Sequence, residues 1–288
     1  MSKKIYKLVS VLMLSAAILG VLSGCASNKE TVSEEANRLE AIKERGYIEV
    51  ATEPYFAPYE FIDPSKQGTE QYVGSDIELA KYIAEKLGVE LRIVPLEFAA
   101  VLSSITEGKY DLAISALAYT PARAEAMNMS KGYNFTDEGI GYGLLIRKAD
   151  EVNIKSPADI KDKIIVAQSG SLQELFVNEQ VPAYKEFKRV SATTDGLLMV
   201  QESKADVCAV SIDMAQLYID ANPDAGLMIV KDFNFTVDES TQGTRIGIQK
   251  GEDELTDEIN KIIDEVVSNG QFKKWHAEYT EYSKSLGL

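Results

Sequence analysis

The residue best suited to bind a charged ligand is Arg123, which lies three positions after Thr120. Threonine is a favoured N-cap and Pro121 suits the first helical position, so a helix is predicted to begin here. Arg123 would then lie in its first turn, where unpaired backbone N–H groups and the helix dipole favour an anion. A planar guanidinium can bind a carboxylate through two hydrogen bonds. A solvated surface arginine is the simpler alternative.

Two further segments could bind the same ligand. Residues 168–171 (Gln-Ser-Gly-Ser) follow an apolar strand and lead into a helix, where backbone N–H groups form an anion site. Asp213 follows another apolar run and precedes an apolar helix. Open parallel sheets bind ligands at the carboxyl ends of their strands, so Arg123 and these N–H groups could hold a carboxylate and Asp213 an ammonium. A capping box at Ser171 and a plain N-cap at Asp213 are the structural alternatives.

The elements that would position these residues follow a repeated pattern. Short apolar runs alternate with helical patterns in the order β-α-β-α-β, which predicts a mostly parallel sheet covered by helices. The predicted strands are 47–51, 89–94, 112–117, 164–167, 207–212 and 244–249, and the predicted helices are 75–87, 99–107, 171 onward, 195–202, 214–219, 255–267 and 271–279. Ser75 or Asp76 would cap the first helix, and Gly88 would end it.

The chain also shows signs of two similar halves. A helix, a tight turn and an Asp-led apolar strand recur at an offset of 95 residues, matching Leu102, Ile105, Glu107 and Asp111 with Leu197, Val200, Glu202 and Asp206. We interpret this as two α/β lobes of similar build, although generic signals could coincide. A shorter repeat matches residues 131–136 with 231–236, and both are expected to lead into hinge strands. Lobe 1 would comprise residues 40–136 and 241–288, and lobe 2 residues 137–240.

Composition and charge argue against several classes of function. The chain has 288 residues, 45% of them hydrophobic, which is ample for two lobes. Its net charge of −15 argues against nucleic-acid partners and against adsorption to anionic membranes. A single histidine, His276, argues against a Ser-His-Asp triad or a histidine-based metal site, and no P-loop pattern occurs. We therefore expect no metal and no cofactor, and we expect Cys208, which lies in an apolar run, to be a core residue.

The N-terminal segment is typical of an export signal. Three lysines within the first seven residues precede an apolar run from 8 to 22 that is short for a spanning helix. The run ends in Leu22-Ser23-Gly24-Cys25, which resembles the lipobox of bacterial lipoproteins. The resemblance implies a signal peptide at 1–24, a lipid on Cys25, and anchoring to the extracellular face of the bacterial cell membrane. Residues 25–39 would form a flexible tether. An ordinary signal peptide with an incidental cysteine is the alternative.

Five motifs, in this order, resemble the family 3 extracellular solute-binding proteins of amino-acid ABC importers. They are 57–61 (Ala-Pro-Tyr-Glu-Phe), 73–80 (Val-Gly-Ser-Asp-Ile-Glu-Leu-Ala), 108–111 (Gly-Lys-Tyr-Asp), 120–123 (Thr-Pro-Ala-Arg) and 166–171 (Val-Ala-Gln-Ser-Gly-Ser). The resemblance spans 40–285 and implies a two-lobed periplasmic-binding-protein-like fold. Each lobe would be a mostly parallel sheet flanked by helices, and two hinge strands would join them. It further implies a monomer that captures one amino acid without chemistry and delivers it to a membrane permease.

The same resemblance implies roles for individual residues. The arginine of the family's Thr-x-x-Arg motif, here Arg123, would clamp the α-carboxylate, and Asp213 would take the α-ammonium. Phe56 and Phe98 would flank the ligand side chain, and Glu53 would contact it. The complete predicted ligand-binding set is Glu53, Phe56, Phe98, Ala118, Thr120, Arg123, Gln168, Ser171, Leu172 and Asp213.

Two departures from the family pattern bear on the ligand. Ala116 and Ala118 stand where the family often has Ser, Thr or Gly, so a hydroxyl contact is lost, and Gln168 occupies a position that varies. Glu53 and Gln168 favour a polar or cationic side chain. Two alternatives remain open. One is an enzyme on the same fold that dehydrates cyclic acids, with Glu53 as general acid. The other is a ligand-sensing lipoprotein without a transport role.

Overall fold

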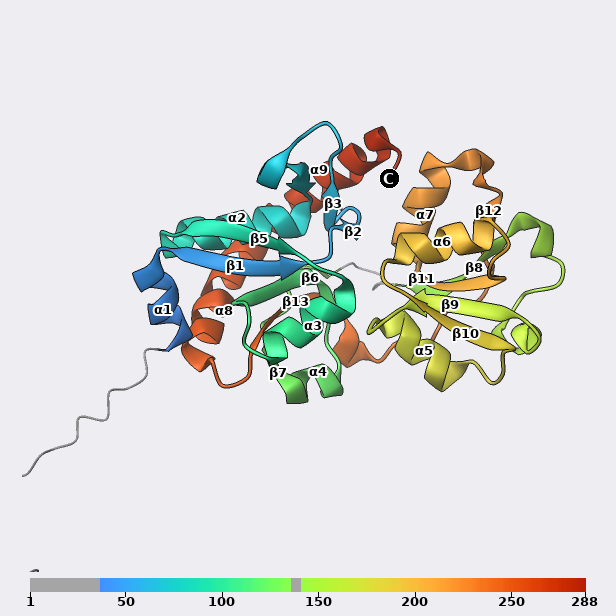
Figure 1. Cartoon of the computed structure of the whole chain (residues 1–288), viewed down its shortest axis with the longest axis horizontal. Helices are drawn as coiled ribbons and strands as arrows, with labels where there is room; N and C mark the ends of the chain where they lie inside the picture. The colour runs from blue at the N-terminus through green and yellow to red at the C-terminus, as the bar shows by residue number, and fades with distance from the viewer. Residues whose placement is uncertain (1–36, 136–140) are drawn as a thin grey trace, which may run out of the picture. The chain divides into compact units, whose positions relative to one another are not determined.

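The computed structural model describes residues 37–135 and 141–288, which fold as two α/β lobes (Figure 1). Each lobe contains a five-stranded sheet with helices on both faces, so the predicted fold class is confirmed. The signal peptide, Cys25 and nearly all of the expected tether lie outside the described residues, as does Thr136. Across the described residues, no helix combines the length and the apolar character that crossing a membrane requires.

The first sheet has the strand order β5-β1-β6-β13-β7. The bounds are Tyr47–Thr52 for β1, Glu90–Pro95 for β5, Leu112–Ala118 for β6, Met127–Met129 for β7 and Thr244–Gln249 for β13. Strands β5, β1 and β6 are parallel, with Val50 opposite Leu112, whereas β13 is antiparallel to both of its neighbours. The sheet is therefore mostly parallel, as predicted, and β13 is its one reversed strand.

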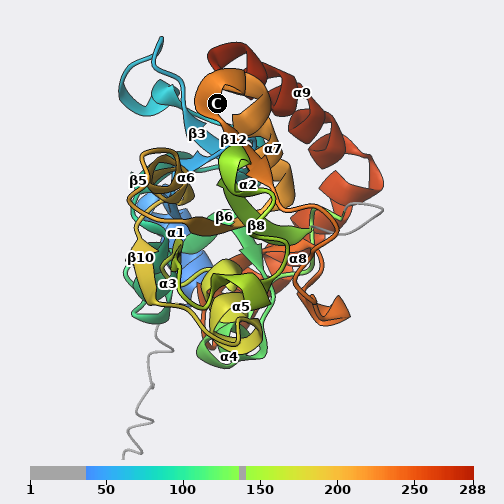
Figure 2. The ribbon, with the colours of Figure 1, turned by 90° about the vertical axis from the view of Figure 1, so that its right-hand side faces the viewer.

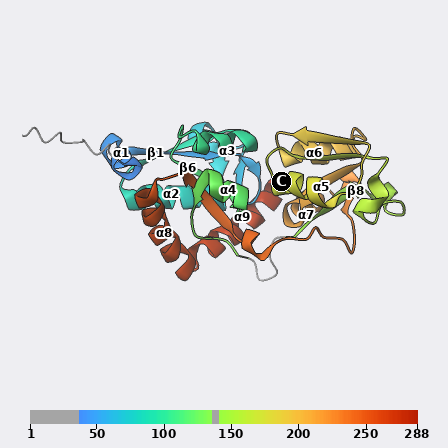
Figure 3. The same cartoon turned by 90° about the horizontal axis from the view of Figure 1, so that it is seen from below.

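Helices bury both faces of this sheet. They are α1 (Arg38–Arg45), α2 (Ser75–Leu87), α3 (Phe98–Thr106), α4 (Pro121–Ala126), α8 (Asp253–Ser268) and α9 (Gln271–Leu286). Leu112 and Ile114 of β6 pack in the core with α2 and α8, whereas Ala113 and Leu117 pack with α3. Figure 3 shows α3 on one side of the sheet and α2 and α8 on the other. Because neighbouring residues of a strand face opposite sides, burial on both sides explains the continuous apolar run of β6.

The second sheet belongs to the lobe that faces the viewer in Figure 2. It has the strand order β10-β9-β11-β8-β12 and the same pattern of one reversed strand, β8. The strands are β8 (Tyr142–Arg147), β9 (Ile164–Gln168), β10 (Glu186–Val190), β11 (Val207–Ser211) and β12 (Leu227–Ile229), and the helices are α5 (Leu172–Gln180), α6 (Thr193–Gln201) and α7 (Ile212–Ala221). Residues of α5 pack on one face, and those of α6 and α7 pack on the other. Cys208 is fully buried there, as expected, and burial raises the pKa of its thiol to about 12.

Small elements complete the chain. A three-stranded sheet of the first lobe consists of β2 (Tyr55–Phe56), β3 (Glu60–Ile62) and β4 (Tyr72–Val73). The single-turn 3₁₀ helices are η1 (Gly68–Gln71), η2 (Lys148–Asp150), η3 (Pro157–Ile160), η4 (Pro223–Ala225) and η5 (Glu239–Thr241).

The predicted cap of α2 is wrong. The N-cap is Gly74, and the side chains of Ser75 and Asp76 lie within the helix instead. Gly74 has a φ of +130°, and a Cβ there would lie 2.1 Å from the carbonyl oxygen of Tyr59, so only glycine fits. Asp76 is buried beneath the first sheet's end and accepts hydrogen bonds from the backbone N–H of Ala116 and from another side chain. Gly88 ends the helix in a left-handed conformation, as predicted.

The repeat at an offset of 95 residues corresponds to the same structural device in each lobe. Asp111 accepts a hydrogen bond from the backbone N–H of Glu49 at 2.7 Å, and Asp206 accepts one from Ile164 at 2.8 Å. Each carboxylate thereby joins the start of one parallel strand to the start of the next. The two tight turns also match, because Gly108 and Ser203 both have φ near +60°. The repeated residues thus hold the amino ends of the central strands.

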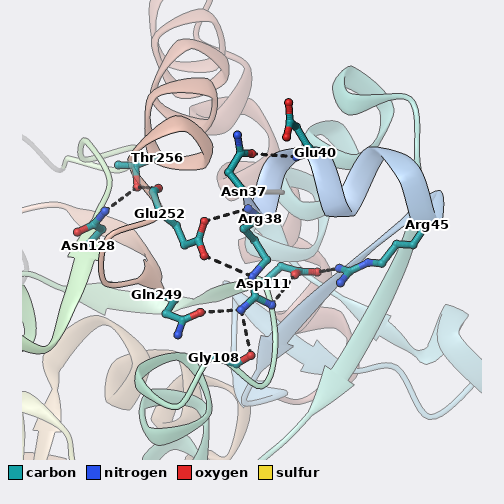
Figure 4. Close-up of polar contacts among 10 residues, drawn as sticks. All are labelled: Asn37, Arg38, Glu40, Arg45, Gly108, Asp111, Asn128, Gln249, Glu252 and Thr256. Atoms are coloured by element: carbon teal, nitrogen blue, oxygen red, sulfur yellow. Dashed lines mark hydrogen bonds and ion pairs between the residues drawn. The ribbon is translucent and has the colours of Figure 1, made fainter. Parts of the chain in front are cut away.

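In the first lobe this carboxylate belongs to a larger polar cluster (Figure 4). Asp111, whose side chain is fully buried, forms ion pairs with Arg38 and Arg45 of α1. Arg38 also donates to Gln249 at 2.6 Å and to the carbonyl of Gly108 at 3.1 Å. The guanidinium of Arg38 therefore ties α1 to the loop before β6 and to the end of β13. Satisfying a buried carboxylate in this way stabilises the lobe, because an unpaired buried charge is strongly unfavourable.

The segments expected to lead into hinges each end on one lobe before the chain passes to the other. Tyr133 is buried in the first lobe and its N–H donates to Thr244, and Asn134 also pairs with Thr244. Phe235 is buried in the core of the second lobe and its N–H donates to Tyr142. Both segments lie next to the points where the chain passes from one lobe to the other. Their role as entries to the hinges therefore stays a prediction.

We predict that Asp111→Ala destabilises the protein more than Asp206→Ala. The first substitution leaves two arginines without their buried partner, which typically lowers the free energy of unfolding by about 3 kcal/mol. The side chain of Asp206 is 27% exposed. Its replacement is expected to lower the free energy of unfolding by about 1 kcal/mol. Urea unfolding followed by circular dichroism measures both values. Equal losses in the two variants would contradict the proposed importance of the cluster in Figure 4.

Candidate functional site

A cavity of about 360 Å³ lies at the carboxyl ends of the parallel strands of both lobes. Glu53 follows β1 and Arg123 follows β6, whereas Gln168 ends β9 and Asp213 follows β11. All four side chains line the cavity. This is the place where open α/β sheets bind ligands, because strand ends and helix starts converge there.

Nearly all of the predicted ligand-binding residues come together in this cavity. It is lined by Glu53, Phe56, Phe98, Ala118, Arg123, Gln168, Ser171, Leu172 and Asp213. Thr120 is not among the lining residues, because its hydroxyl accepts a hydrogen bond from the backbone N–H of Arg123 at 3.1 Å and caps α4. The N-cap role of Thr120 is as expected, and its contact with a ligand stays a prediction.

Arg123 is a buried cation held by backbone carbonyls. Its guanidinium donates to Ala118 at 2.7 Å and to Gly170 of the other lobe at 3.0 Å, and it lies 5.5 Å from the ring centroid of Phe98. Only 9% of the residue is exposed, and burial lowers its pKa to about 10. Within the described residues, no carboxylate lies within 4 Å of this guanidinium. Since a buried charge is unfavourable without a counter-charge, the site favours an anion.

The guanidinium is better suited than the end of α4 to bind an anion. Helix α4 has only six residues, which is too short for a substantial helix dipole. The predicted capping box at the start of α5 is also only half correct. Ser171 accepts from Glu174 N–H at 3.1 Å, but the carboxylate of Glu174 accepts from Gly170 and not from Ser171. The hydroxyl of Ser171 donates to the carbonyl of Gln168 at 2.7 Å.

The helix that contains Asp213 begins two residues earlier than predicted. Helix α7 begins at Ile212 with Ser211 as N-cap, so Asp213 lies inside the first turn and is not a cap. The reason is that β11 ends one residue earlier than the apolar run suggests. Its carboxylate still lines the cavity, near the hydroxyl of Tyr142. Burial raises the pKa of Tyr142 to about 12, and the charges of Arg123 and Asp213 act on it in opposite directions.

Glu53 is the second unusual titratable group of the cavity. The residue is 1% exposed, and its Oε1 has no hydrogen-bond partner among the described atoms. Burial raises the pKa of Glu53 to about 8; a hydrogen bond with Gln168 partly opposes this shift, and the charge of Asp195 adds to it. A buried carboxyl with an unused oxygen is suited to a hydrogen-bond donor or a cation from a ligand.

Beneath Glu53 lies a pair of buried carboxyl groups that sequence analysis missed. Ser115 accepts from Glu53 N–H at 3.0 Å and donates to Glu60 at 2.8 Å. Burial and the neighbouring Asp76 raise the pKa of Glu60 well above its usual range, whereas that of Asp76 rises to about 6. One oxygen of each acid, Glu60 Oε2 and Asp76 Oδ1, has no hydrogen-bond partner among the described atoms. Both belong to motifs singled out in the sequence, but their contact depends on the packing of β3 against α2.

The wall formed by α9 was also missed. Helix α9 continues to Leu286, well beyond its predicted end, and its residues His276, Thr280 and Lys284 line the cavity. The His276 ring lies 3.1 Å from the hydroxyl of Ser75, and burial lowers its pKa to about 4, so it is neutral at pH 7. Among the described residues, no group of three potential ligands is arranged to hold a metal ion.

Comparisons with known proteins decide the family. Residues 48–282 match the model of the bacterial extracellular solute-binding proteins, family 3. The chain belongs to this family. The resemblance noted in the sequence is thereby confirmed, together with the expected solute-binding role, and proteins of this family are extracellular.

Individual relatives agree with this assignment. The chain is 26% identical over 268 residues to the arginine-binding extracellular protein ArtP of Bacillus subtilis, covering 92% of this chain and 94% of ArtP. It is 22% identical over 269 residues to the L-cystine-binding protein TcyA of the same organism, covering 90% and 94%.

Solved structures show the same fold. The substrate-binding protein AbpA of Streptococcus pneumoniae, bound to L-arginine, superposes with a TM-score of 0.75 at 30% identity, covering 85% of this chain and 98% of AbpA. The ancestral amino-acid-binding protein AncCDT-1, a precursor of cyclohexadienyl dehydratase, superposes with a TM-score of 0.71 at 25% identity, covering 85% and 100%.

We predict that Glu53→Gln becomes progressively more stable than the wild type as the pH rises from 5 to 8. A carboxyl whose pKa rises from 4.5 to about 8 on folding binds more protons in the native state. Its contribution to stability is therefore lost with rising pH, by up to about 1.4 kcal/mol per pH unit. Urea unfolding of both proteins across this range measures the difference. The exposed Glu125→Gln serves as control, and a pH-independent difference for Glu53→Gln would refute the shift.

Proposed function

We propose that this chain is the substrate-binding component of an ABC importer and captures an L-amino acid with a positively charged side chain. The observation that carries the proposal is one cavity lined by a buried cation and by a buried carboxyl with an unused oxygen. A basic amino acid supplies the complement of both groups. Relatives named for arginine binding, among them ArtP and AbpA, support this choice.

In this proposal the α-carboxylate of the ligand lies against Arg123 and its α-ammonium against Asp213. The guanidinium has its anion-binding capacity available, because its partners within the described chain are carbonyl oxygens. The charges of Arg123 and Asp213 both act on the pKa of Tyr142, so Tyr142 lies near both groups. Charge-assisted hydrogen bonds of this kind contribute about 1.5–3 kcal/mol each.

The ligand side chain is proposed to pass Phe56 and Phe98 and to end at Glu53 and Gln168. Aromatic faces attract a guanidinium or ammonium, and the approach of such a cation favours ionisation of a buried carboxyl. Glu53 is then protonated in the empty site and charged in the complex. Ala116 and Ala118 supply no hydroxyl group at their own positions in the cavity wall, so the polar contacts come from other lining residues.

Transport follows from binding without chemistry. Ligand groups contacted by both lobes stabilise the state in which the lobes are closed, since only that state makes both sets of contacts. We propose that lobe 1 comprises 40–136 and 241–288 and lobe 2 comprises 137–240, and the strand composition of the two sheets supports this division. The closed monomer would dock on a membrane permease. The lipobox-like sequence supports a lipid on Cys25 and a place on the extracellular face of the cell membrane.

An enzyme on the same fold is the second candidate, favoured by one observation. With a pKa of about 8, Glu53 is protonated at neutral pH, as a general acid must be. We propose that the chain is not an enzyme, because the relatives ArtP and AbpA are named as binding proteins. Turnover of a cyclic carboxylic acid would favour the enzyme over the importer component. A ligand-sensing role would be favoured by binding without uptake in cells.

We predict that Arg123→Ala weakens binding of L-arginine by about 100-fold or more, because the α-carboxylate loses its charged partner. Isothermal titration calorimetry on protein refolded after removal of bound ligand measures the dissociation constant. Arg245→Ala is the matched control: its guanidinium also binds backbone carbonyls in the first lobe, but it does not line the cavity. An unchanged dissociation constant for Arg123→Ala would remove the residue from the site.

A further inference from the structure

A second cavity, of about 660 Å³, meets the first one at Glu53. The lining residues are Glu53, Pro54, Tyr55, Ile62, Tyr72, Pro95, Leu96, Glu97, Ser191, Ala192, Thr194 and Asp195. Part of this lining comes from the end of β5 and from the loops after β1, β5 and β10, at the carboxyl ends of strands in both lobes. The rest comes from the small sheet (Tyr55, Ile62 and Tyr72) and from the first turn of α6 (Thr194 and Asp195). Glu53 lines both cavities. The two cavities therefore adjoin at Glu53, and we call the second one the outer groove.

The outer groove has the chemistry of a cation site. Glu97 of the first lobe and Asp195 of the second bring two exposed carboxylates to it, and no lysine or arginine is among the described residues that line it. Glu97 is the N-cap residue of α3 but makes no side-chain cap hydrogen bond, so its carboxylate is not used for that purpose. Tyr55, which is 51% exposed, and Tyr72 add aromatic rings, which attract cations.

Independent support comes from Glu53 itself. Its unused Oε1 lies on a side chain that is 1% exposed, between a cavity that already contains a cation and a groove that contains carboxylates. The charge of Asp195 acts directly on Glu53, which places the two carboxyl groups within electrostatic reach of each other. A positive group on the far side of Glu53 would therefore meet further negative charge.

Resting on the proposed function, we propose that the outer groove receives the distal end of side chains longer than that of arginine, provided that this end is positively charged. The ligand class thereby extends to lysine derivatives whose Nε carries a short, cation-terminated acyl group. Their α-amino-acid end would occupy the same place as in arginine, against Arg123 and Asp213, while the terminal ammonium would lie near Glu97 and Asp195.

Three lysine derivatives of equal length test the proposal. Nε-(β-alanyl)-lysine ends in an ammonium, Nε-butyryl-lysine in a methyl group and Nε-succinyl-lysine in a carboxylate. We expect the β-alanyl derivative to bind about tenfold more tightly than the succinyl derivative, the size of effect for two partly exposed charge pairs. The butyryl derivative should lie between them. Titration calorimetry on the full folded chain, with L-arginine as reference, gives the ratio.

The double variant Glu97→Gln/Asp195→Asn should reduce this ratio to about one- to threefold, because the charges that distinguish the two ligand ends are gone. Glu107→Gln/Glu202→Gln is the matched control. It removes one exposed carboxylate from each lobe at the opposite ends of the sheets, and the ratio should remain about tenfold. Because the readout is a ratio, general effects of a variant on the amino-acid end of the ligand cancel.

The possible outcomes separate this inference from the function on which it rests. If L-arginine binds but none of the three derivatives does, or if they bind equally, the outer groove has no such role and the proposed function stands. If the ratio survives in the double variant, the discrimination arises elsewhere and the inference is wrong. If L-arginine itself does not bind, the proposed function fails and the inference fails with it.

Discussion

The arrangement of the site depends on one constraint: a guanidinium buried at the junction of two lobes must be neutralised. Arg123 is held by a carbonyl of its own lobe and by one of the other lobe, and these bonds orient the cation without cancelling its charge. The capping of α4 by Thr120 fixes the backbone from which the side chain projects. In the proposed function, a carboxylate of the ligand supplies the missing counter-charge and thereby couples ligand binding to closure of the lobes.

Glu53 is the acidic counterpart of Arg123, a buried carboxyl group with one oxygen that has no partner among the described atoms. Glu53 is supported from below by Ser115 and by the acid pair of Glu60 and Asp76, which concentrates carboxyl groups at the end of the first sheet. Burial raises the pKa of Glu53 and of Glu60, which favours their neutral forms. In the proposed function, a zwitterion with a basic side chain supplies a counter-charge to Arg123 and a hydrogen-bond donor to Glu53 in one cavity.

Much of this could be predicted because strong local signals coincide with strand ends. Thr120-Pro121 specifies a helix start wherever it occurs, and the apolar run before it requires a buried strand, so Arg123 could be placed from sequence. Tyr142, Glu60 and Asp76 could not, because their roles arise from contacts between β8, β3 and α2 that no local pattern encodes. The extent of α9 was underestimated since its later residues pack against a small sheet and line the cavity, which weakens their periodicity.

The most direct test of the account compares L-arginine with L-citrulline, which replaces the guanidinium by a neutral urea group of nearly the same shape. Calorimetry on the wild type and on Glu53→Gln gives four dissociation constants. The account predicts that the wild type prefers arginine by about 10- to 100-fold, as expected for a charge-assisted hydrogen bond, and that Glu53→Gln loses this preference. The same preference in both proteins would contradict the claim that Glu53 selects a positively charged side chain.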